Sequence, residues 1–120
     1  RTHNSAHFSI EACSSSQFDQ YVCISSGIKP PEIKMNSQGS LMINLLGLSK
    51  KFPLPIKKRL ELLSQIRGSN LHWYGKSKES VGRKMAHITF LLNEDNQSKR
   101  VEKSKEILNK VREIWPSPND

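Results

Sequence analysis

The chain has 120 residues, of which 35% are hydrophobic and 25% are charged, and its formal net charge is +8. These values are typical of one globular domain with a polar surface, or of part of one. They exclude a membrane-spanning chain, because no apolar run approaches the ~20 residues that a spanning helix needs. Residues 1–49 are balanced in charge, so the basic excess lies in residues 50–120 and suits nucleic acid, an anionic surface or a phosphorylated ligand.

The first predicted elements are a short strand and a helix. His7-Phe8-Ser9-Ile10 alternates in polarity, which predicts a strand that is entered from a polar loop. Ser16 and Asp19 have the spacing of a capping box, and an apolar helical face follows them. Gly27 is a natural end for this helix, and the two prolines after Lys29 predict a turn or an extended link.

The next elements are expected to form most of the core. The compact apolar run Leu41–Leu46 predicts a buried strand, because it is too short for a helix. Apolar residues at helical spacing predict a helix over Lys57–Arg67. Leu71–Tyr74 and Met85–Leu92 predict two further strands. We therefore expect an α+β fold with a small, mostly antiparallel sheet of three to four strands and about three helices.

A last helix is predicted after a polar turn at residues 93–96. Its apolar stripe comprises Val101, Leu108, Val111 and Trp115, and Pro116 ends it.

A polar segment at the start of the chain is the first candidate site. It combines a fixed cation, two imidazoles, an amide and a hydroxyl, supplied by Arg1, His3, Asn4, Ser5 and His7. Arginine suits carboxylate, bicarbonate or phosphate oxygens, and histidine can donate a hydrogen bond or carry a proton near neutral pH. The segment cannot be buried without polar partners, so it is either a solvated end or the wall of a polar pocket.

A basic loop (Lys76–Lys84) between the last two predicted strands is the second candidate. Lys76, Arg83 and Lys84 can converge on one anion, such as a ribose phosphate, if the loop folds back. Gly82 permits a tight turn there. The alternative is a basic surface turn. The P-loop pattern is absent, and no basic stripe is interleaved with several aromatic residues, which weakens a nucleic-acid interpretation.

Other chemically capable residues favour structural roles. His72-Trp73-Tyr74 could stack a base, but a strand with core aromatics is the favoured interpretation. His87 lies within an apolar strand and is expected to be a structural histidine. The two cysteines, Cys13 and Cys23, are expected to be reduced, packed thiols of a cytosolic protein. No spacing of Asp, Glu, His or Cys predicts a metal site.

Five blocks of sequence resemble the N5-carboxyaminoimidazole ribonucleotide synthetases, a family of ATP-grasp ligases, in the same order. Residues 1–12 resemble the family's Arg-Pro-His-Asn-Ser-Gly-His segment, and residues 16–20 resemble the Ser-Gln-Phe-Glu start of its next helix. Residues 41–47 are similar to its Met-Val-Asn-Leu-Leu-Gly strand. Residues 72–76 and 82–89 resemble its C-terminal hairpin, and Gly-Arg-Lys-Met-Ala-His in the latter block is the clearest mark.

The resemblance implies the C-terminal portion of an ATP-grasp enzyme. Residues 1–27 would end the ATP-grasp domain, and residues 28–120 would form the associated C-terminal domain. The chain begins without Met or an apolar signal region, so we interpret it as part of a longer chain. ATP and Mg²⁺ would be bound upstream in the full-length enzyme, a cytoplasmic homodimer, and this fragment alone would bind no cofactor and show no ligase activity.

The resemblance also implies a reaction and its site residues. ATP and bicarbonate would give carboxyphosphate, whose carboxyl or CO₂ is captured by 5-aminoimidazole ribonucleotide in de novo purine biosynthesis. The implied catalytic residues are Arg1, His3 and Lys84, and the implied substrate-binding residues are Asn4, Lys76, Arg83 and Lys84. Arg1, His3 and Asn4 would face bicarbonate or carboxyphosphate. Lys76, Arg83 and Lys84 would hold the 5′-phosphate, with Lys84 near the reacting carboxyl.

The chain departs from the family pattern at positions outside this set. Thr2 and Ala6 stand where Pro and Gly are common, Ser80-Val81 stands where Arg-Pro is common, and Ala86 replaces a further glycine. The missing arginine could cost one anion contact.

Two alternatives stay open beside the ligase. The formate-dependent glycinamide ribonucleotide transformylase, also an ATP-grasp enzyme, has a related Arg-x-His-Asp segment. Asn4, Trp73-Tyr74 and the Gly-Arg-Lys-Met run favour the carboxylating enzyme. A small basic nucleic-acid-binding module would instead show steep salt dependence. The favoured interpretation involves neither nucleic acid nor a membrane.

Overall fold

The computed structural model describes residues 1–49 and 52–118. These residues form a 3₁₀ helix (Asn4–Ala6), α1 (Ser9–Ala12), α2 (Gln17–Ser25), β1 (Gly39–Leu46), α3 (Ile56–Ser64), β2 (Asn70–Trp73), β3 (Lys84–Leu92) and α4 (Gln97–Ile114). The expected α+β class is confirmed, although the described residues contain four α-helices rather than about three. None of these helices is both long and apolar enough to cross a membrane.

The three strands form one antiparallel sheet in the order β1-β3-β2. The central strand β3 pairs with β1 through Ile88 opposite Ile43, and with β2 through His87 opposite His72. The three strands predicted over residues 41–46, 71–74 and 85–92 are therefore confirmed, with boundaries that differ by one or two residues. Because β3 is central, almost all of its side chains are buried, which explains its nearly continuous apolar sequence.

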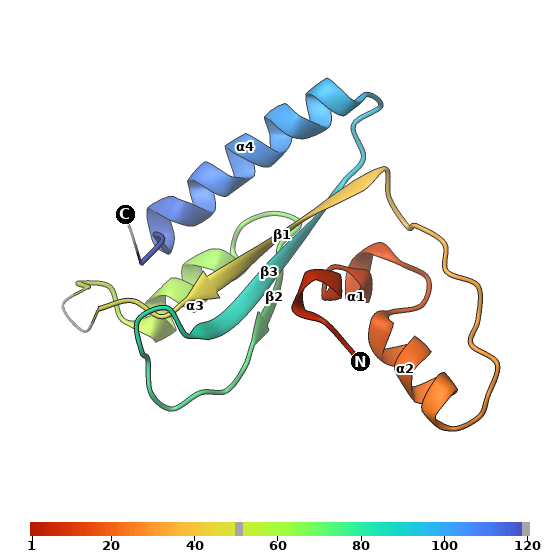
Figure 1. Cartoon of the computed structure of the whole chain (residues 1–120). Helices are drawn as coiled ribbons and strands as arrows, with labels where there is room; N and C mark the ends of the chain where they lie inside the picture. Colours follow the sequence, from red (N-terminus) through yellow and green to blue (C-terminus); the bar gives the residue numbers. More distant parts are fainter. Residues whose placement is uncertain (50–51, 119–120) are drawn as a thin grey trace.

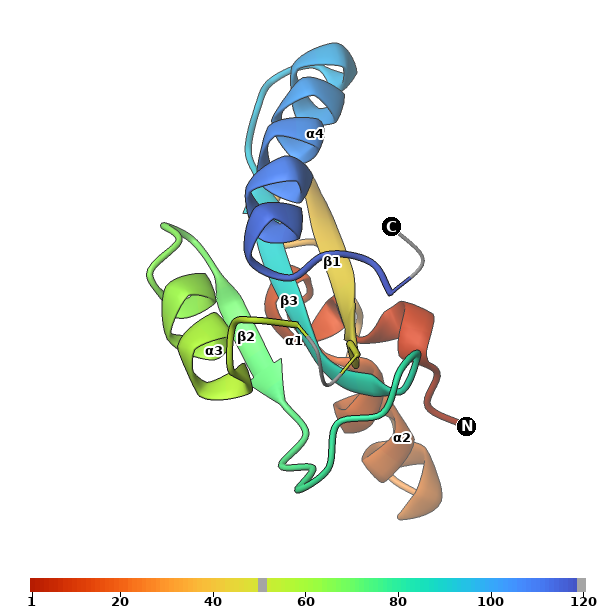
Figure 2. The same cartoon turned by 90° about the vertical axis from the view of Figure 1, so that its left-hand side faces the viewer.

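The two faces of the sheet differ in chemistry. The side chains on one face pack against α3 and α4 and form the hydrophobic core, which includes Ile43, Leu45, Leu63, Ile88, Phe90, Ile107, Val111 and Trp115. Figure 2 shows α4 lying along this face, over β1 and β3. Alternation along the strands places Asn44, His72, His87 and Thr89 on the opposite face. In Figure 1 this polar face is turned toward α1 and α2.

The predicted stripe of α4 is partly wrong. Val111 and Trp115 are fully buried, as predicted, but Val101 and Leu108 are 47% and 36% exposed. The third core residue is Ile107, which lies four residues before Val111 and therefore on the same side of the helix. The indole N–H of Trp115 donates to the carbonyl of Leu46 at 2.7 Å, and this bond fixes which side of α4 faces the sheet.

The predicted strand at His7–Ile10 is wrong, because the segment forms a turn after the 3₁₀ helix and then the start of α1. The N–H of Ile10 donates to the carbonyl of His7, and the N–H of Ala12 donates to that of Phe8. Four alternating residues also fit a helical turn, and only a neighbouring strand would have favoured the extended form. Cys13 and Cys23 are free thiols, the first buried and the second half-buried.

Helix α2 begins as the sequence predicts. The Ser16 side chain accepts from the N–H of Asp19, whose carboxylate accepts from the N–H of Ser16, so the capping box is complete. Gly27 follows the helix with a φ of 69°, in the left-handed region that glycine favours. Contrary to an ordinary amphipathic helix, no residue of α2 is buried, and Tyr21 and Val22 are exposed.

Candidate functional site

The basic loop folds back on the end of β1, as the sequence allows. The N–H of Gly47 donates to the carbonyl of Arg83 at 2.7 Å, and the N–H of Gly82 donates to the carbonyl of Gly47 at 3.0 Å. Gly82 has a φ of 76°, in the left-handed region, so glycine is the residue that adopts this turn before Arg83 without strain. The side chains of Arg83 and Lys84 are exposed at the point where the loop enters β3.

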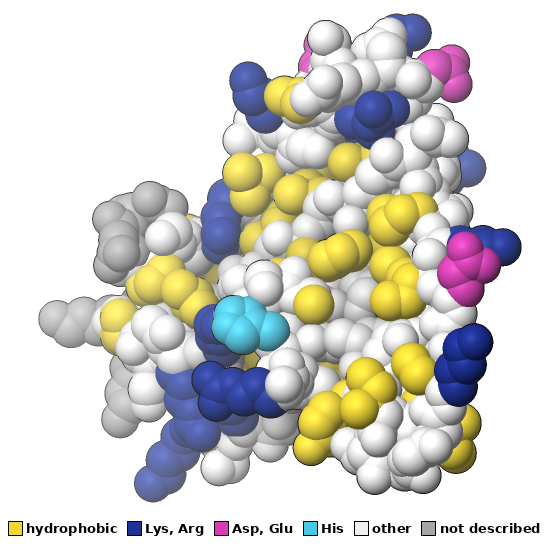
Figure 3. Space-filling model, turned by 45° about the vertical axis from the view of Figure 1, so that its right-hand side comes forward, with side chains coloured by type: hydrophobic (Ala, Val, Ile, Leu, Met, Phe, Trp, Pro, Cys, Tyr) yellow, Lys and Arg dark blue, Asp and Glu magenta, His cyan; other side chains and the backbone are white. Residues whose placement is uncertain are grey.

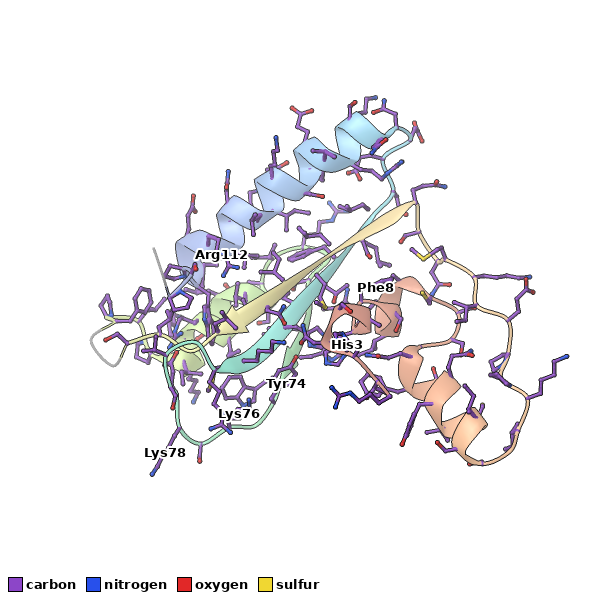
Figure 4. All side chains as sticks on the ribbon, viewed as in Figure 1. His3, Phe8, Tyr74, Lys76, Lys78 and Arg112 are labelled. Atoms are coloured by element: carbon purple, nitrogen blue, oxygen red, sulfur yellow. The ribbon has the colours of Figure 1, made fainter. Side chains whose placement is uncertain are left out.

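Lys76 lies across the loop from Lys84. Its Nζ donates to the carbonyl of Lys84 and stands 5.6 Å from the centroid of the Tyr74 ring. In Figure 4 Lys76 lies next to Tyr74, whereas Lys78 points away from the body of the protein at the far end of the loop. Figure 3 shows Lys and Arg side chains gathered beside a histidine on the surface of the protein. The loop therefore holds two lysines close together and directs a third outward.

A cluster of histidines lies beside Lys84, on the polar face of the sheet. The rings of His72 and His87 are stacked, with centroids 4.5 Å apart, and the ring of His7 is 5.1 Å from that of His87. The Tyr74 hydroxyl lies 2.7 Å from Nδ1 of His87. A carboxylate oxygen of Glu11, in α1, contacts Nε2 of His72. These contacts join the start of the chain to the two strands that flank the basic loop.

The surroundings of His87 and His7 favour their neutral forms. Burial, followed by the charges of the neighbouring His72 and His7, lowers the pKa of His87 to about 4. Burial also lowers the pKa of His7, and the charge of Lys84 acts in the same direction, followed by those of His72 and His3. Lys84 and His3 therefore both lie within electrostatic range of His7. At neutral pH the cluster can accept or donate hydrogen bonds beside these charges without adding charge from His87.

Gln17 holds the first residues of the chain in place. Its Oε1 accepts from the N–H of His3 at 2.6 Å, and its Nε2 lies 2.8 Å from the carbonyl of His3. The same Nε2 lies 2.7 Å from Nδ1 of His7. One amide at the start of α2 thus fixes both histidines of the polar segment. Sequence reasoning did not identify Gln17, Glu11 or His72 as site residues, because their partners lie 10 to 61 residues away.

Replacing Gln17 with alanine is expected to release the polar segment without unfolding the sheet. The loss of three hydrogen bonds at a half-exposed site should lower the free energy of unfolding by about 1 kcal/mol. Amide exchange at His3 and Ala6 should become faster, while exchange in β3 stays unchanged. Hydrogen exchange followed by NMR measures both, with the exposed Gln65→Ala as control. Unchanged exchange at residues 3–7 would contradict this role of Gln17.

The structure brings together only part of the predicted site. His3, Lys76 and Lys84 lie around the histidine cluster, and Arg83 lies beside Lys84 on the loop. Asn4 begins the 3₁₀ helix, where its carbonyl accepts from the N–H of His7. Arg1 lines a depression beside α2 with Gln17, Gln20, Tyr21, Ile24 and Ile33. Within the described residues, no hydrogen bond or ion pair joins Arg1 to the basic loop.

The described residues do not fit a metal centre. In residues 1–49 and 52–118, no group of three or more His, Cys, Asp or Glu side chains could hold a metal ion. The Mg²⁺ that the resemblance implies for the full-length enzyme is expected to be bound upstream of this chain, and no chemical step is assigned to it here.

Comparison with known proteins gives first the class and then the family. The fold is that of the corresponding part of N5-carboxyaminoimidazole synthetase from Staphylococcus aureus, with a TM-score of 0.68 and 36% identity over 93% of this chain and 28% of that one. It also matches N5-carboxyaminoimidazole synthase from Aspergillus clavatus in complex with ADP and 5-aminoimidazole ribonucleotide, with a TM-score of 0.70 and 26% identity over 91% of this chain and 29% of that one.

The phosphoribosylaminoimidazole carboxylase C-terminal domain model matches residues 40–101, and the chain belongs to that family. A curated relative is the N5-carboxyaminoimidazole ribonucleotide synthase of Synechococcus elongatus, which is 35% identical over 99% of this chain and 30% of its own length. The chain therefore spans less than a third of the curated relatives it matches.

Proposed function

We propose that this chain is the C-terminal part of an ATP-dependent ligase that carboxylates 5-aminoimidazole ribonucleotide with bicarbonate in de novo purine biosynthesis. The observation that carries the proposal is the position of the basic loop, which presents Arg83 and Lys84 beside the histidine cluster of a family member. The products would be N5-carboxyaminoimidazole ribonucleotide, ADP and phosphate. The ADP and 5-aminoimidazole ribonucleotide in the Aspergillus clavatus complex support both ligands.

The basic loop would bind the 5′-phosphate of the ribonucleotide. Arg83 and Lys84 are exposed cations on a loop whose backbone is fixed, and a phosphate dianion accepts charge-assisted hydrogen bonds from both. Lys76 would join them by exchanging the Lys84 carbonyl for a phosphate oxygen. The ammonium group of Lys84 would lie closest to the reacting carboxyl. Together these cations would orient the labile carboxyphosphate dianion and restrict the access of water to it.

The polar segment would face bicarbonate or carboxyphosphate. His3 is held by Gln17, and the charges of both Lys84 and His3 lower the pKa of His7, which supports a role for His3 close to the phosphate site. Asn4 follows directly in the chain. Arg1 would have to leave the depression beside α2 to reach the same anion. Its role in catalysis therefore requires a rearrangement of the first two residues.

The division into two domains is also a proposal. Residues 1–27 would complete an ATP-grasp domain, and residues 28–120 would form the associated C-terminal domain. The family model begins at residue 40, and the segment before it exposes the apolar residues Phe18, Tyr21, Val22, Ile24, Ile28 and Ile33. An ATP-grasp domain of the length seen in the relatives would cover this surface, bind ATP and Mg²⁺, and complete a cytoplasmic homodimer.

Neither alternative is favoured. The relatives and solved structures described above are carboxyaminoimidazole ribonucleotide synthases, and none is named as a transformylase. A nucleic-acid-binding module is disfavoured because the cations of α4 are partly neutralised. Lys103 and Lys110 both pair with Glu106. Hydrogen bonds, first from Lys110 and then from Lys103, lower the pKa of Glu106 to about 2.

Ligand binding by the loop tests the phosphate site. The 120-residue chain is expected to bind 5-aminoimidazole ribonucleotide and ribose 5-phosphate weakly, with amide shifts at residues 82–84 in an NMR titration. Lys84→Ala and Arg83→Ala should each weaken binding roughly tenfold, because each removes a charge-assisted hydrogen bond. Lys78→Ala removes the same charge from the same loop, where the side chain points away, and should leave affinity unchanged. Tight binding of duplex DNA without any response to ribose phosphates would contradict the proposal.

Activity is tested in a chimera, because the relatives are about three times as long. Here the chain replaces the matched segment of the Synechococcus elongatus synthase, which it aligns with over 119 residues. The chimera should hydrolyse ATP in a manner that depends on both bicarbonate and 5-aminoimidazole ribonucleotide. The Lys84→Ala chimera should lose this dependence, whereas the Lys78→Ala chimera should keep it. A folded chimera that hydrolyses ATP at the same rate with and without the ribonucleotide would exclude the proposed reaction.

A further inference from the structure

A buried ion pair holds the basic loop from below. The Glu79 carboxylate accepts from Nη1 and Nη2 of Arg59, in α3, at 2.9 and 2.6 Å. The side chain of Arg59 is 2% exposed and that of Glu79 is 14% exposed. One oxygen of Glu79 also accepts from the N–H of Leu48 at 2.8 Å. Glu79 therefore turns inward from a basic surface loop and connects it with α3 and with the residue after Gly47.

Arg59 is itself fixed by the hydrophobic core. Its guanidinium carbon lies 4.0 Å from the centroid of Trp115 and 5.4 Å from that of Phe52, and Nε donates to the carbonyl of Leu54 at 3.0 Å. The planar group is therefore restrained by two rings, a carbonyl and a carboxylate, which leaves it one orientation. Burial works against the Glu79 carboxylate, but the bonds from Arg59 and Leu48 prevail and lower its pKa.

The loop backbone is held at the same place from the other side. A Cβ atom on Gly47 would lie 2.1 Å from the carbonyl oxygen of Ser80, so only glycine permits this approach. The two backbone bonds between Gly47 and residues 82–83 depend on the same approach. The loop contains no proline between Gly75 and Lys84 to stiffen it locally. The local turn bond from the N–H of Arg83 to the carbonyl of Ser80 is therefore supplemented by long-range contacts, which hold the whole loop in place.

A buried ion pair is rarely needed for stability alone. Because both charges must be desolvated, apolar residues of similar volume often give an equally stable protein, whereas removal of one partner strands the other. Apolar residues in place of Arg59 and Glu79 would not accept the hydrogen bond from the N–H of Leu48, and they would not fix the direction of the loop. The geometry therefore points to a role in positioning.

We propose that Arg59 and Glu79 are positioning residues, which hold the basic loop so that Arg83 and Lys84 present their charges to a phosphate in a fixed direction. The identity of that ligand rests on the proposed function. A loop that is already ordered loses less conformational entropy when it binds, so the ion pair raises phosphate affinity without touching the phosphate.

The test is a double variant, Arg59→Met with Glu79→Leu, in the 120-residue chain. It removes both charges together and so avoids an unpaired buried charge. Amide exchange at Gly82 and Arg83 should become roughly tenfold faster, and the dissociation constant for ribose 5-phosphate should rise by a similar factor. Exchange in the centre of β3 should stay at the wild-type rate. The matched control is Lys58→Met with Glu61→Leu, which removes an exposed pair from the same helix and should change neither quantity.

Each outcome decides the proposal. Faster exchange confined to residues 79–83 supports positioning, and so does partial recovery of affinity in a variant that keeps the charge, Arg59→Lys with native Glu79. Wild-type exchange in the loop overturns the proposal, as does faster exchange across the whole sheet, which would indicate a general structural role. If the wild-type chain does not bind ribose 5-phosphate, the proposed function fails, while loop exchange still decides whether the ion pair positions the loop.

Discussion

Replacing Trp115 with alanine is expected to destabilise the protein by about 4 kcal/mol, in the range for loss of a fully buried aromatic side chain. Trp115 has no exposed surface and lies in the core between α4 and the sheet. Its truncation would also remove the donor to the Leu46 carbonyl and one of the two rings that restrain Arg59. A loss of this size is a large share of the 5–15 kcal/mol that typically separates folded from unfolded states.

Urea denaturation followed by circular dichroism measures this change. Trp115→Phe is the matched variant, because it keeps a ring under Arg59 and removes the indole N–H, and it should cost about 1 to 2 kcal/mol. Val101→Ala alters an exposed residue of the same helix and should change stability by less than about 0.5 kcal/mol. An equal loss for Val101→Ala and Trp115→Ala would mean that α4 packs through a different face.

Acidification from pH 7 to pH 5 is expected to lower stability, because the folded protein keeps His87 neutral. The pKa of His87 is lowered from 6.5 to about 4, mainly by burial, and that of His7 is lowered as well. Below pH 6.5 the unfolded chain binds protons that the folded chain does not, so the stabilisation present above pH 6.5 is lost as the pH falls. At 1.36 kcal/mol per pKa unit the full loss for His87 is about 3 kcal/mol, of which most would occur by pH 5.

His87→Gln isolates this contribution. The groups that face His87 are His72 on β2, His7 before α1, and the Tyr74 hydroxyl. Burial raises the pKa of this hydroxyl. The variant should be less stable than the wild type at pH 7, and its stability should fall less steeply between pH 7 and pH 5. His3→Gln, at an exposed position, is the control. Measurement above pH 5 avoids the carboxylates, whose contributions change at lower pH. Equal slopes for wild type and His87→Gln would contradict a buried neutral His87.

The sequence predicts the sheet and the basic loop better than it predicts the site. The strand at Leu41–Leu46, the capping box at Ser16 and the hairpin that carries Lys84 are local patterns, and all three are present in the structure. The strand expected at His7–Ile10 failed because four residues do not distinguish alternation from a helical turn. The stripe of α4 was displaced by one residue, because Ile107 and Leu108 are equally apolar and only the sheet decides between them.

The parts of the site that could not be predicted depend on long-range contacts. Glu11 contacts His72 across 61 residues, and Arg59 pairs with Glu79 across 20. Each of these residues, taken alone, is a charged or polar side chain without a distinctive neighbour in sequence. The residue pattern and the resemblance to a family together indicated His3, Lys76, Arg83 and Lys84. They indicated neither the support beneath the basic loop nor the amide that holds the polar segment.

The difference between the two faces of the sheet gives the protein two separable units of stability. The apolar core lies between the sheet, α3 and α4, whereas His7 and α1 contact the face that carries Asn44, His72, His87 and Thr89. If the first helical turns were displaced, water would hydrate those polar groups while the core stayed covered. Partial opening should therefore cost less free energy than global unfolding. Such an opening would separate His3 and His7 from Lys84 while the sheet that carries the basic loop remains folded.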